Sequence, residues 1–447
     1  MAGLITVGGL ATGLDTNSII DQLVALEKRP VQLLGIEVQD VQATQTSINT
    51  LGSKLATLRS AAHALATTDG VLVRAATSSD TDVLAAAAGA GAQPGSVTLT
   101  ATQLARGSVA GATVGVPAAT STVASGPGTF QFQVGSGTVQ SVNVDATTTL
   151  QGLVSSINAL DAGVTASAVN LGTASSPDFR LEIVSKSTGA TSTVTVTHDD
   201  TALAVQTAQA GQNAQFTVDG FSGTFERESN TFGDVLSGVT VTLRDKGTAT
   251  VSVADDADAI TDKVKTLVAA FNDIVTFVTG ESQVTETQDK SDVTLGSLAT
   301  DSTVKHLVAR LHEVFSESVG GTYTNLSSLG LATQQDGTIT FDEGKFRTAL
   351  GSDSTAVAAT FAGAGTASGV AKDLSALIDA MTASGGTLAL HSTALDGQIR
   401  SLQDQIDAGQ REVDAFEANL REQFTALESF VSGLKSQGSF LTQAFGR

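Results

Sequence analysis

The sequence predicts an α+β, multidomain protein with paired terminal helices, a helical leg domain and β-rich head domains formed by the middle of the chain. Apolar residues recur in alternating steps of four and three near both ends, between 34 and 65 and between 395 and 434, which is the coiled-coil repeat. Residues 71–253 are instead rich in Thr, Ser, Val and Gly, with the short alternating runs of strands. We call each of these two apolar rows a seam. The two terminal seams are candidates to pair with one another as coiled-coil-like legs.

Composition narrows the functions that the chain can carry. Among its 447 residues there is no Cys and no Trp, and the formal charge is −21. Without Cys there are no disulfides, thiolate nucleophiles or Cys-ligated metal centres. The negative charge disfavours nucleic acid and anionic membranes, which are bound through Lys and Arg. No run of 18 apolar residues exists and the first residues lack a basic n-region, so we expect neither membrane insertion nor a cleaved signal peptide.

Residues 1–66 are predicted to be an N-terminal helical, coiled-coil segment that pairs with the C-terminus. Asp15 is a plausible N-cap, and Pro30 should interrupt the first helix because proline lacks the backbone donor. The second helix carries a seam of apolar residues, which are Leu34, Val38, Val41, Ile48, Leu51, Leu55 and Leu58.

Residues 81–254 are predicted to form the β-rich head. Alternating runs such as Phe130–Val134 are separated by turn signals such as Asp219-Gly220. One helix is expected where Leu150, Leu153, Val154 and Ile157 recur at helical spacing. We expect two subdomains in the head, one of them inserted at about residues 107–200.

Residues 67–80 and 255–384 are predicted to form a helical leg domain with a small hairpin. A broad apolar stripe begins after Asp258, and Asp301 can cap a further helix. Gln335-Asp336-Gly337 marks the hairpin turn. Gly385-Gly386 should end the last helix of this domain.

Residues 385–447 are predicted to be a C-terminal coiled-coil helix that supplies the main assembly surface. Its seam consists of Leu395, Ile399, Leu402, Ile406, Val413, Phe416, Leu420, Leu427, Phe430 and Leu434. Gly409 and Gln423 are weak seam positions that should loosen packing locally and let the leg flex. A helix from 395 to 434 is roughly 60 Å long. Its seam must be covered by the N-terminal seam or by another copy of the chain.

No catalytic, cofactor or metal site can be assembled from the sequence. His306 and His312 are six residues apart on a helix and face different directions. His198-Asp199-Asp200 is better explained as a solvated turn than as an acid–base site, and the aspartates near Asp258 suit a helix N-terminus. Neither a dinucleotide-binding glycine motif nor a P-loop is present. The residues therefore predict an assembly protein rather than an enzyme.

Several motifs resemble the family of flagellar filament-capping proteins, also called hook-associated protein 2. The opening GLATGLDTNSIIDQLVALEKRP matches that family's start through Gly9, Leu10, Gly13, Leu14, Asp15, Glu27 and Pro30. Further similar segments are FTVDG at 216–220, SNTFGDVLSGVTVTL at 229–243, LVAAFNDIVTFV at 267–278, SLGLATQQDGTITFDEGKFRTAL at 328–350 and LREQFTALESFVSGLKSQGSFLTQAF at 420–445. Residues 139–159 resemble the insert motif of flagellins and hook-associated proteins. Phe271 and Phe440 depart from the family, which commonly has Tyr there.

The resemblance implies a structural cap, secreted to the distal tip of the bacterial flagellum, that promotes insertion of exported flagellin and prevents its loss. It implies a ring-shaped homo-oligomer, usually a pentamer, which contacts flagellin and the hook–filament junction protein. It also implies export by the flagellar type III system without a cleaved signal, with a cytoplasmic chaperone on the C-terminal helix. The alternatives are another hook-associated junction protein, a flagellin-like filament subunit, or a tip adhesin whose head binds host mucin.

Overall fold

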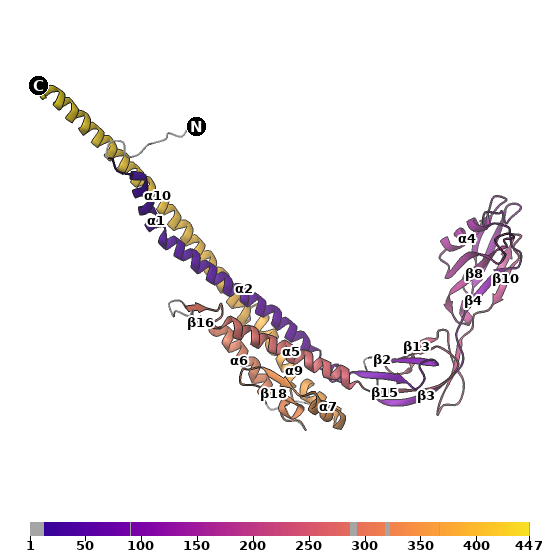
Figure 1. Ribbon diagram of the computed structural model, residues 1–447. Helices are drawn as coiled ribbons and strands as arrows, with labels where there is room; N and C mark the ends of the chain where they lie inside the picture. Colours follow the sequence, from indigo (N-terminus) through magenta and orange to yellow (C-terminus); the bar gives the residue numbers. More distant parts are fainter. Residues whose placement is uncertain (1–12, 90, 287–292, 318–321, 366, 447) are drawn as a thin grey trace. The chain divides into compact units, whose positions relative to one another are not determined.

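The computed structural model describes residues 13–89, 91–286, 293–317, 322–365 and 367–446, without the side chains of residues 286, 293, 442, 444 and 445. The chain forms two compact units. One contains the chain up to Val71 and from Ile260 onward, and the other is Leu72–Ala259. Helices and strands are labelled in Figure 1. Gly9 and Leu10 of the N-terminal motif lie outside the described residues.

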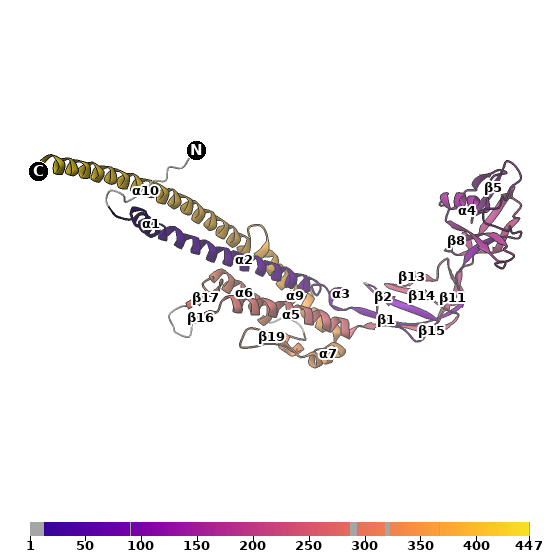
Figure 2. The ribbon, with the colours of Figure 1, turned by 45° about the horizontal axis from the view of Figure 1, so that its top comes forward.

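The second unit begins with a β-sandwich. Its larger sheet has the order β1-β15-β3-β11-β12 and its smaller sheet the order β13-β14-β2, and Figure 2 labels strands of both. Leu99, Phe216 and Val251 of the larger sheet and Val241 of the smaller are buried in the core between them. The strands are β1 (Arg74–Ser78), β2 (Leu84–Ala88), β3 (Gly95–Gln103), β11 (Ala214–Val218), β12 (Phe225–Arg227), β13 (Thr231–Leu236), β14 (Val239–Leu243) and β15 (Gly247–Asp255).

A second β-rich lobe with its own core lies between β3 and β11 in the sequence. Two sheets, of orders β10-β4-β8-β7 and β6-β5-β9, pack with helix α4 around Phe130, Phe132, Leu153 and Ile183. Thr149 caps α4 by accepting from the Gly152 N–H. The elements are β4 (Gly107–Ala112), β5 (Gly128–Val134), β6 (Gln140–Val144), α4 (Leu150–Ala159), β7 (Val164–Asn170), β8 (Phe179–Thr188), η1 (Ala190–Ser192), β9 (Val194–Asp199) and β10 (Val205–Gln209).

The start of the head differs from the sequence prediction. Residues 72–80 were expected in the helical leg, but β1 is an edge strand of the sandwich and pairs antiparallel with β15, Ala76 opposite Val253. At the other junction, β15 runs to Asp255, and the second unit continues to Ala259. Arg74 and Asp255 form an ion pair at this end of the sheet.

The first unit contains a helical body built on α5 and α6. Phe271 of α5 packs against Phe315 of α6, and its ring meets His312 edge-on, with centroids 5.0 Å apart. The Asn272 amide holds the β18–β19 hairpin by bonding both the N–H and the carbonyl of Ile339. The elements are α3 (Thr68–Val71), α5 (Ala257–Glu281), β16 (Val284–Glu286), β17 (Val293–Leu295), α6 (Ser302–Ser316), η2 (Leu326–Leu329), β18 (Leu331–Thr333), β19 (Ile339–Phe341), α7 (Glu343–Ser352), α8 (Ser354–Ala362) and α9 (Val370–Thr382).

The terminal helices complete the first unit. They are α1 (Thr16–Glu27), α2 (Arg29–His63) and the single long helix α10 (Thr387–Phe445). The predicted break between α9 and α10 is confirmed, because the chain turns at Gly385, whose φ is +95°. Figures 1 and 2 both show α1 and α2 lying along α10.

Candidate assembly surface on the terminal helices

Local sequence signals shape the N-terminal helices as predicted. The Asp15 side chain caps α1 by accepting a hydrogen bond of 3.1 Å from the Ser18 N–H. Pro30 stands in the first turn of α2, where its missing donor costs nothing. The Gln32 N–H bonds back to the Lys28 carbonyl, so α2 begins almost where α1 ends.

The part of the seam nearest the helical body, which we call the lower part, is a helix pair whose apolar residues are covered. On α2, Leu34 is half-buried and the other predicted seam residues, Val38, Val41, Ile48, Leu51, Leu55 and Leu58, are buried. On α10, Leu395 and Leu402 are buried, while Ile399 and Ile406 are half-buried. The apolar faces of α2 and α10 remove each other from water as far as Gly52, which faces Leu388 at the start of α10, and α9 also packs against α2. This burial is the favourable term that holds the helices together.

Farther along α10, the upper part of the pair is a smaller cluster formed by α1, the first turn of α2 and α10. Ile20, Val24 and Val413 are buried together, and partly buried side chains pack around them, which are Val31, Phe416, Leu420 and Phe424. Within this stretch Gly409 faces Val31, since a Cβ built on Gly409 would lie 2.8 Å from the Val31 Cγ2. The glycine that the sequence suggested would loosen the seam is therefore a position of close approach.

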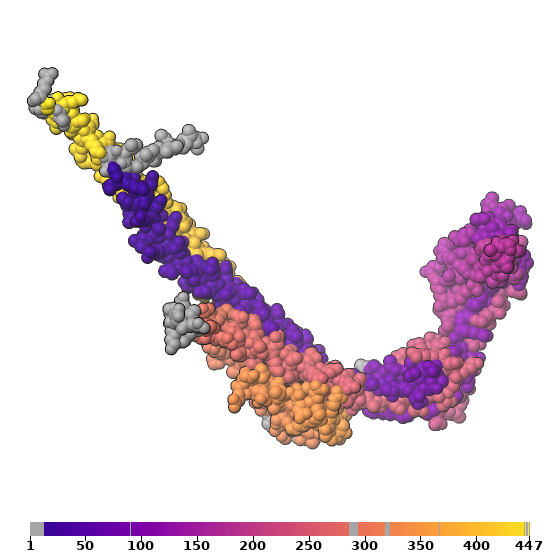
Figure 3. Space-filling model, viewed as in Figure 1, coloured from indigo at the N-terminus to yellow at the C-terminus, as the bar shows by residue number. Residues whose placement is uncertain are grey.

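Beyond this cluster, the seam of α10 is open. Leu427 is 42% exposed, Phe430 is 65% exposed and Leu434 is 50% exposed. Phe440, outside the predicted seam, is also exposed. Figure 3 shows the yellow end of α10 continuing past the start of α1, where the described part of the chain offers no covering helix. Three of the ten predicted seam residues therefore face solvent.

A second apolar face lies on the N-terminal helices. Leu23 and Leu26 of α1 and Leu33 and Ile36 of α2 are exposed, although Ile20 and Val24 on the same stretch are buried. The sequence marked α1 as amphipathic but could not show that part of its apolar surface stays outside. The terminal helices thus expose apolar side chains both on the N-terminal side, from α1 and α2, and on α10.

Polar contacts tie the terminal helices to the helical body. The Lys54 ammonium of α2 lies 2.7 Å from the Asp273 carboxylate of α5. His391 of α10 contacts the nearly buried carboxylate of Asp301 at 2.6 Å. That carboxylate also caps α6 by accepting from the Val304 N–H. These contacts attach the C-terminal half of α2 and the start of α10 to α5 and to the N-terminus of α6.

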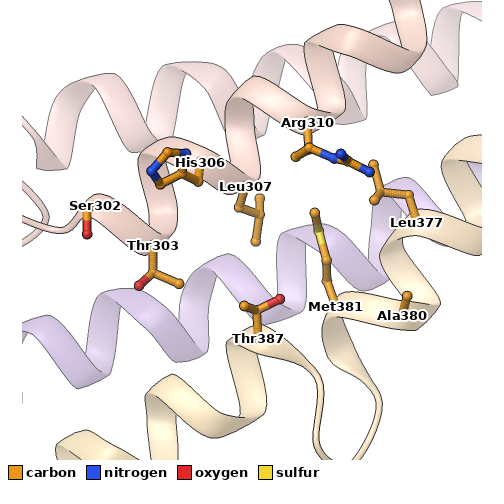
Figure 4. Close-up of a pocket in the computed structure, with 9 residues that line it drawn as sticks. All are labelled: Ser302, Thr303, His306, Leu307, Arg310, Leu377, Ala380, Met381 and Thr387. Carbon is orange, nitrogen blue, oxygen red and sulfur yellow. The ribbon is translucent and has the colours of Figure 1, made fainter.

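The body has a groove beside the start of α10, drawn in Figure 4. Its volume is about 440 Å³. Its apolar lining is Leu307 of α6 with Leu377 and Met381 of α9, and α6 also contributes His306 and Arg310. Arg310 lies 3.5 Å from Glu313. The groove has room for a partner's side chain but no convergent set of groups for catalysis.

Ionisable groups elsewhere do not form a reactive site in the described residues. His198 and Asp200 are 3.0 Å apart and both well exposed, at the end of β9. Burial lowers the pKa of His312, whose ring packs edge-on against Phe271. No group of three His, Cys, Asp or Glu residues among those described could hold a metal ion. No helix in the described chain is long and apolar enough to cross a membrane.

Comparison with known proteins places these features in a family context. The model of the flagellar hook-associated protein 2 C-terminus matches residues 211–436, and that of the N-terminus matches residues 12–108. The A-type flagellar hook-associated protein 2 of Pseudomonas aeruginosa is 29% identical, covering 99% of this chain and 98% of its own. The flagellar hook-associated protein 2 of Escherichia coli K12 is 28% identical, covering 98% and 97%. The crystal structure of the D1-D2-D3 domains of the E. coli flagellar cap protein aligns with a TM-score of 0.64 at 25% identity, covering 79% of this chain and 99% of that one.

Proposed function

The chain belongs to the flagellar hook-associated protein 2 family, the cap proteins of the flagellar filament, and we propose that it caps by steric and conformational means rather than by catalysis. The C-terminal family model alone matches residues 211–436, half of the chain. The observation that carries the proposal is the division of the α10 seam, which is closed as far as Leu420 and open from Leu427. An enzyme would need convergent polar groups, whereas the terminal helices offer apolar side chains.

We propose that several copies form a ring, with five as the expected number, at the distal tip of the filament. Exposed apolar side chains on α1, α2 and α10 support contacts with other chains, because each gains free energy by leaving water. In this arrangement the closed lower pair keeps each leg straight. The exposed end of α10 beyond that pair contacts flagellin as subunits are inserted, and contacts the hook–filament junction protein before the filament grows.

The exposed seam residues at the end of α10 would need a different binding partner inside the cell, before export. Leu427, Phe430 and Leu434 repeat in steps of three and four along one side of α10, which suits a helical partner laid along that side. We propose that an export chaperone covers this side before the chain leaves through the flagellar type III system, without a cleaved signal. Release of the chaperone would then free the seam for assembly outside the cell.

The cap function is tested in a strain from which the gene is deleted. We expect full-length flagellin monomer to accumulate in the medium and filaments to be absent, with both restored by the parent gene. Filaments of normal length in the deletion strain would exclude a capping role.

The role of the open seam is tested by complementing that strain with a double variant, Leu427→Ser with Leu434→Ser. The matched control is Leu390→Ser, which changes an exposed leucine at the start of the same helix. We expect the unfolding midpoints of both variants to equal the parent's, since all three leucines are exposed. Only the double variant should lose flagellin to the medium; equal filament assembly by both variants would contradict the assignment.

A further inference from the structure

Two stretches of chain connect the β-sandwich with the lobe of residues 107–209, which we call the second lobe. Residues 104–106 leave the sandwich after β3, and residues 210–213 return to it before β11. The two stretches pair antiparallel, because the Arg106 N–H donates to the Gln212 carbonyl at 3.0 Å and the Gln212 N–H donates to the Arg106 carbonyl at 3.1 Å. We call them the crossing ribbon. It joins the ladder of β3 with β11 to the ladder of β4 with β10.

A ribbon of two strands does not by itself fix the angle between two lobes. Two-stranded ribbons twist more strongly than wide sheets, and bulges bend them. The ladder shifts register on both sides of the crossing ribbon, between Thr207 and Gln209 and between Gln215 and Phe216. A fixed orientation therefore needs contacts beyond the ladder itself.

Side-chain amides stiffen the crossing ribbon and attach it to the sandwich. Asn230, just before β13, bonds both the N–H and the carbonyl of buried Ala105, at 2.7 and 2.9 Å. An amide side chain carries both donors and an acceptor, so it can take the place of a neighbouring strand. Three glutamines also donate to backbone carbonyls of the opposite strand, which are Gln103 to Asn213 at 2.8 Å, Gln212 to Leu104 at 2.9 Å and Gln209 to Gly107 at 3.0 Å.

A second attachment lies outside the two crossing stretches. The end of β8 and the start of η1 in the second lobe contact Glu228, which stands between β12 and β13 of the sandwich. The Thr188 hydroxyl donates to the Glu228 carbonyl at 2.6 Å, and the Thr191 hydroxyl donates to the Glu228 carboxylate at 2.9 Å. The Ala190 N–H donates to the Asn213 side-chain oxygen at 2.8 Å. We call residues 188–191 together with Glu228 the clamp.

The backbone of the clamp approaches the sandwich too closely for a side chain. Gly189 has a φ of +102°, which favours glycine. A Cβ built on it would lie 2.7 Å from the Glu228 Cβ and 3.0 Å from the Glu228 Cα. The Gly189 N–H also donates to the Arg106 carbonyl of the crossing ribbon at 3.2 Å. The clamp is therefore a close-fitting contact that also bonds to the crossing ribbon.

We propose that the crossing ribbon and the clamp lock the second lobe to the sandwich, so that the two lobes move as one rigid arm. The crossing ribbon alone could twist and bend, whereas a second attachment at Glu228 opposes both movements. A displacement imposed on the second lobe is then passed to the sandwich rather than absorbed at the crossing. This lock acts within one chain and does not depend on the ring in the proposed function.

The lock is tested by measuring the distance between the lobes in solution. The chain has no cysteine, so one spin label can be placed on an introduced cysteine in each lobe. The labelled sites are Thr195→Cys in β9 and Thr240→Cys in β14, both exposed. Double electron–electron resonance on the full-length chain then gives the distribution of label-to-label distances. We expect one narrow distribution.

The clamp is opened by Thr188→Val with Thr191→Val, which removes both hydroxyl donors at nearly constant shape. Both are removed together because a single hydrogen bond contributes little net free energy. The matched control is Thr165→Val with Thr197→Val, two exposed strand threonines of the second lobe. We expect the distribution to become at least twice as wide in the clamp variant and to stay narrow in the control. A parent distribution as wide as that of the clamp variant would overturn the lock.

A glycine pair tests the clamp without removing any hydroxyl. Gly189→Ala introduces the Cβ that would collide with Glu228. Gly163→Ala is its control, because Gly163 also has a positive φ, +72°, but no described atom lies within 4 Å of its Cβ position. Both changes strain the backbone, so both should lower the unfolding midpoint, while hydrogen exchange of the α4 peptide checks that the second lobe stays folded. Only Gly189→Ala should widen the distance distribution at least twofold; equally narrow distributions in the two variants would contradict the clamp.

Discussion

The contact between Gly409 and Val31 makes a quantitative prediction about the terminal helix pair. Gly409→Ala adds a Cβ that would lie 2.8 Å from the Val31 Cγ2, well inside normal contact distance. Val31 is β-branched and stiff in a helix, so it cannot turn its methyl group away freely. The added atom must therefore push the helices apart or strain a side chain.

Two opposing terms decide the size of the effect. Replacing glycine by alanine inside a helix gains about 1 kcal/mol from propensity. Overpacking a tight site costs about 1–3 kcal/mol. Gly397, on the same helix, has open space where its Cβ would go. Gly397→Ala should then stabilise the pair by about 1 kcal/mol, while Gly409→Ala should be neutral or destabilising by up to about 2 kcal/mol.

The assay is hydrogen exchange of the full-length chain, read on peptides from α1 and from the middle of α10. Local exchange is preferred because a chain with several cores does not unfold in one step. Adding Val31→Ala to Gly409→Ala should restore protection, with a coupling of about 1 kcal/mol or more in the double-mutant cycle. If Gly409→Ala raises protection as much as Gly397→Ala does, the close approach is not real and the reasoning fails.

Three further predictions concern the cores. Asn272→Leu removes both hydrogen bonds to Ile339 and should destabilise the helical body by about 2–4 kcal/mol; hydrogen exchange of the β19 peptide checks this, and unchanged protection would contradict it. Phe232→Ala deletes a ring stacked 4.7 Å from Phe216 and should cost the sandwich about 3–5 kcal/mol, seen as lost protection in β11 but not in α4. Because burial lowers the pKa of His312, its contribution to stability is complete above about pH 6.5 and is lost as pH falls through the lower, folded pKa. His312→Gln should flatten the dependence of the α6 unfolding midpoint on pH between 7 and 5, and an unchanged slope would refute it.

The long helices were predictable because their signal repeats over many turns. The seam of α2 and the lower seam of α10 were assigned from spacing alone, and the buried positions match that spacing from Val38 to Leu58. The caps at Asp15 and Asp301 were found because a short polar side chain just before an apolar helical run typically accepts a hydrogen bond from the first turn of the helix. Such signals are local, so they can be recognised without knowledge of the rest of the fold.

Long-range pairing was less accessible to the sequence. Strand β1 has no clear alternation, and its partner β15 lies more than 170 residues away, so residues 72–80 were assigned to the wrong unit. Helices α7 and α8 were missed although each has a local signal. Asp342 accepts from the Lys345 N–H and Asp353 from the Ala356 N–H, as N-caps do. The alternation within the strands of the sandwich was visible, but the order of those strands in two sheets around one core was not.

The open end of α10 also shows why a seam cannot be assigned a partner from its pattern alone. Leu427, Phe430 and Leu434 follow the same spacing as the buried residues, yet they face solvent. Burying them against a partner would gain on the order of 5 kcal/mol. Association itself costs about 4–15 kcal/mol, so these three side chains cannot hold a partner by themselves. Any lasting partner must engage more of the leg, and the exposed Leu23 and Leu33 of α1 and α2 are available for that.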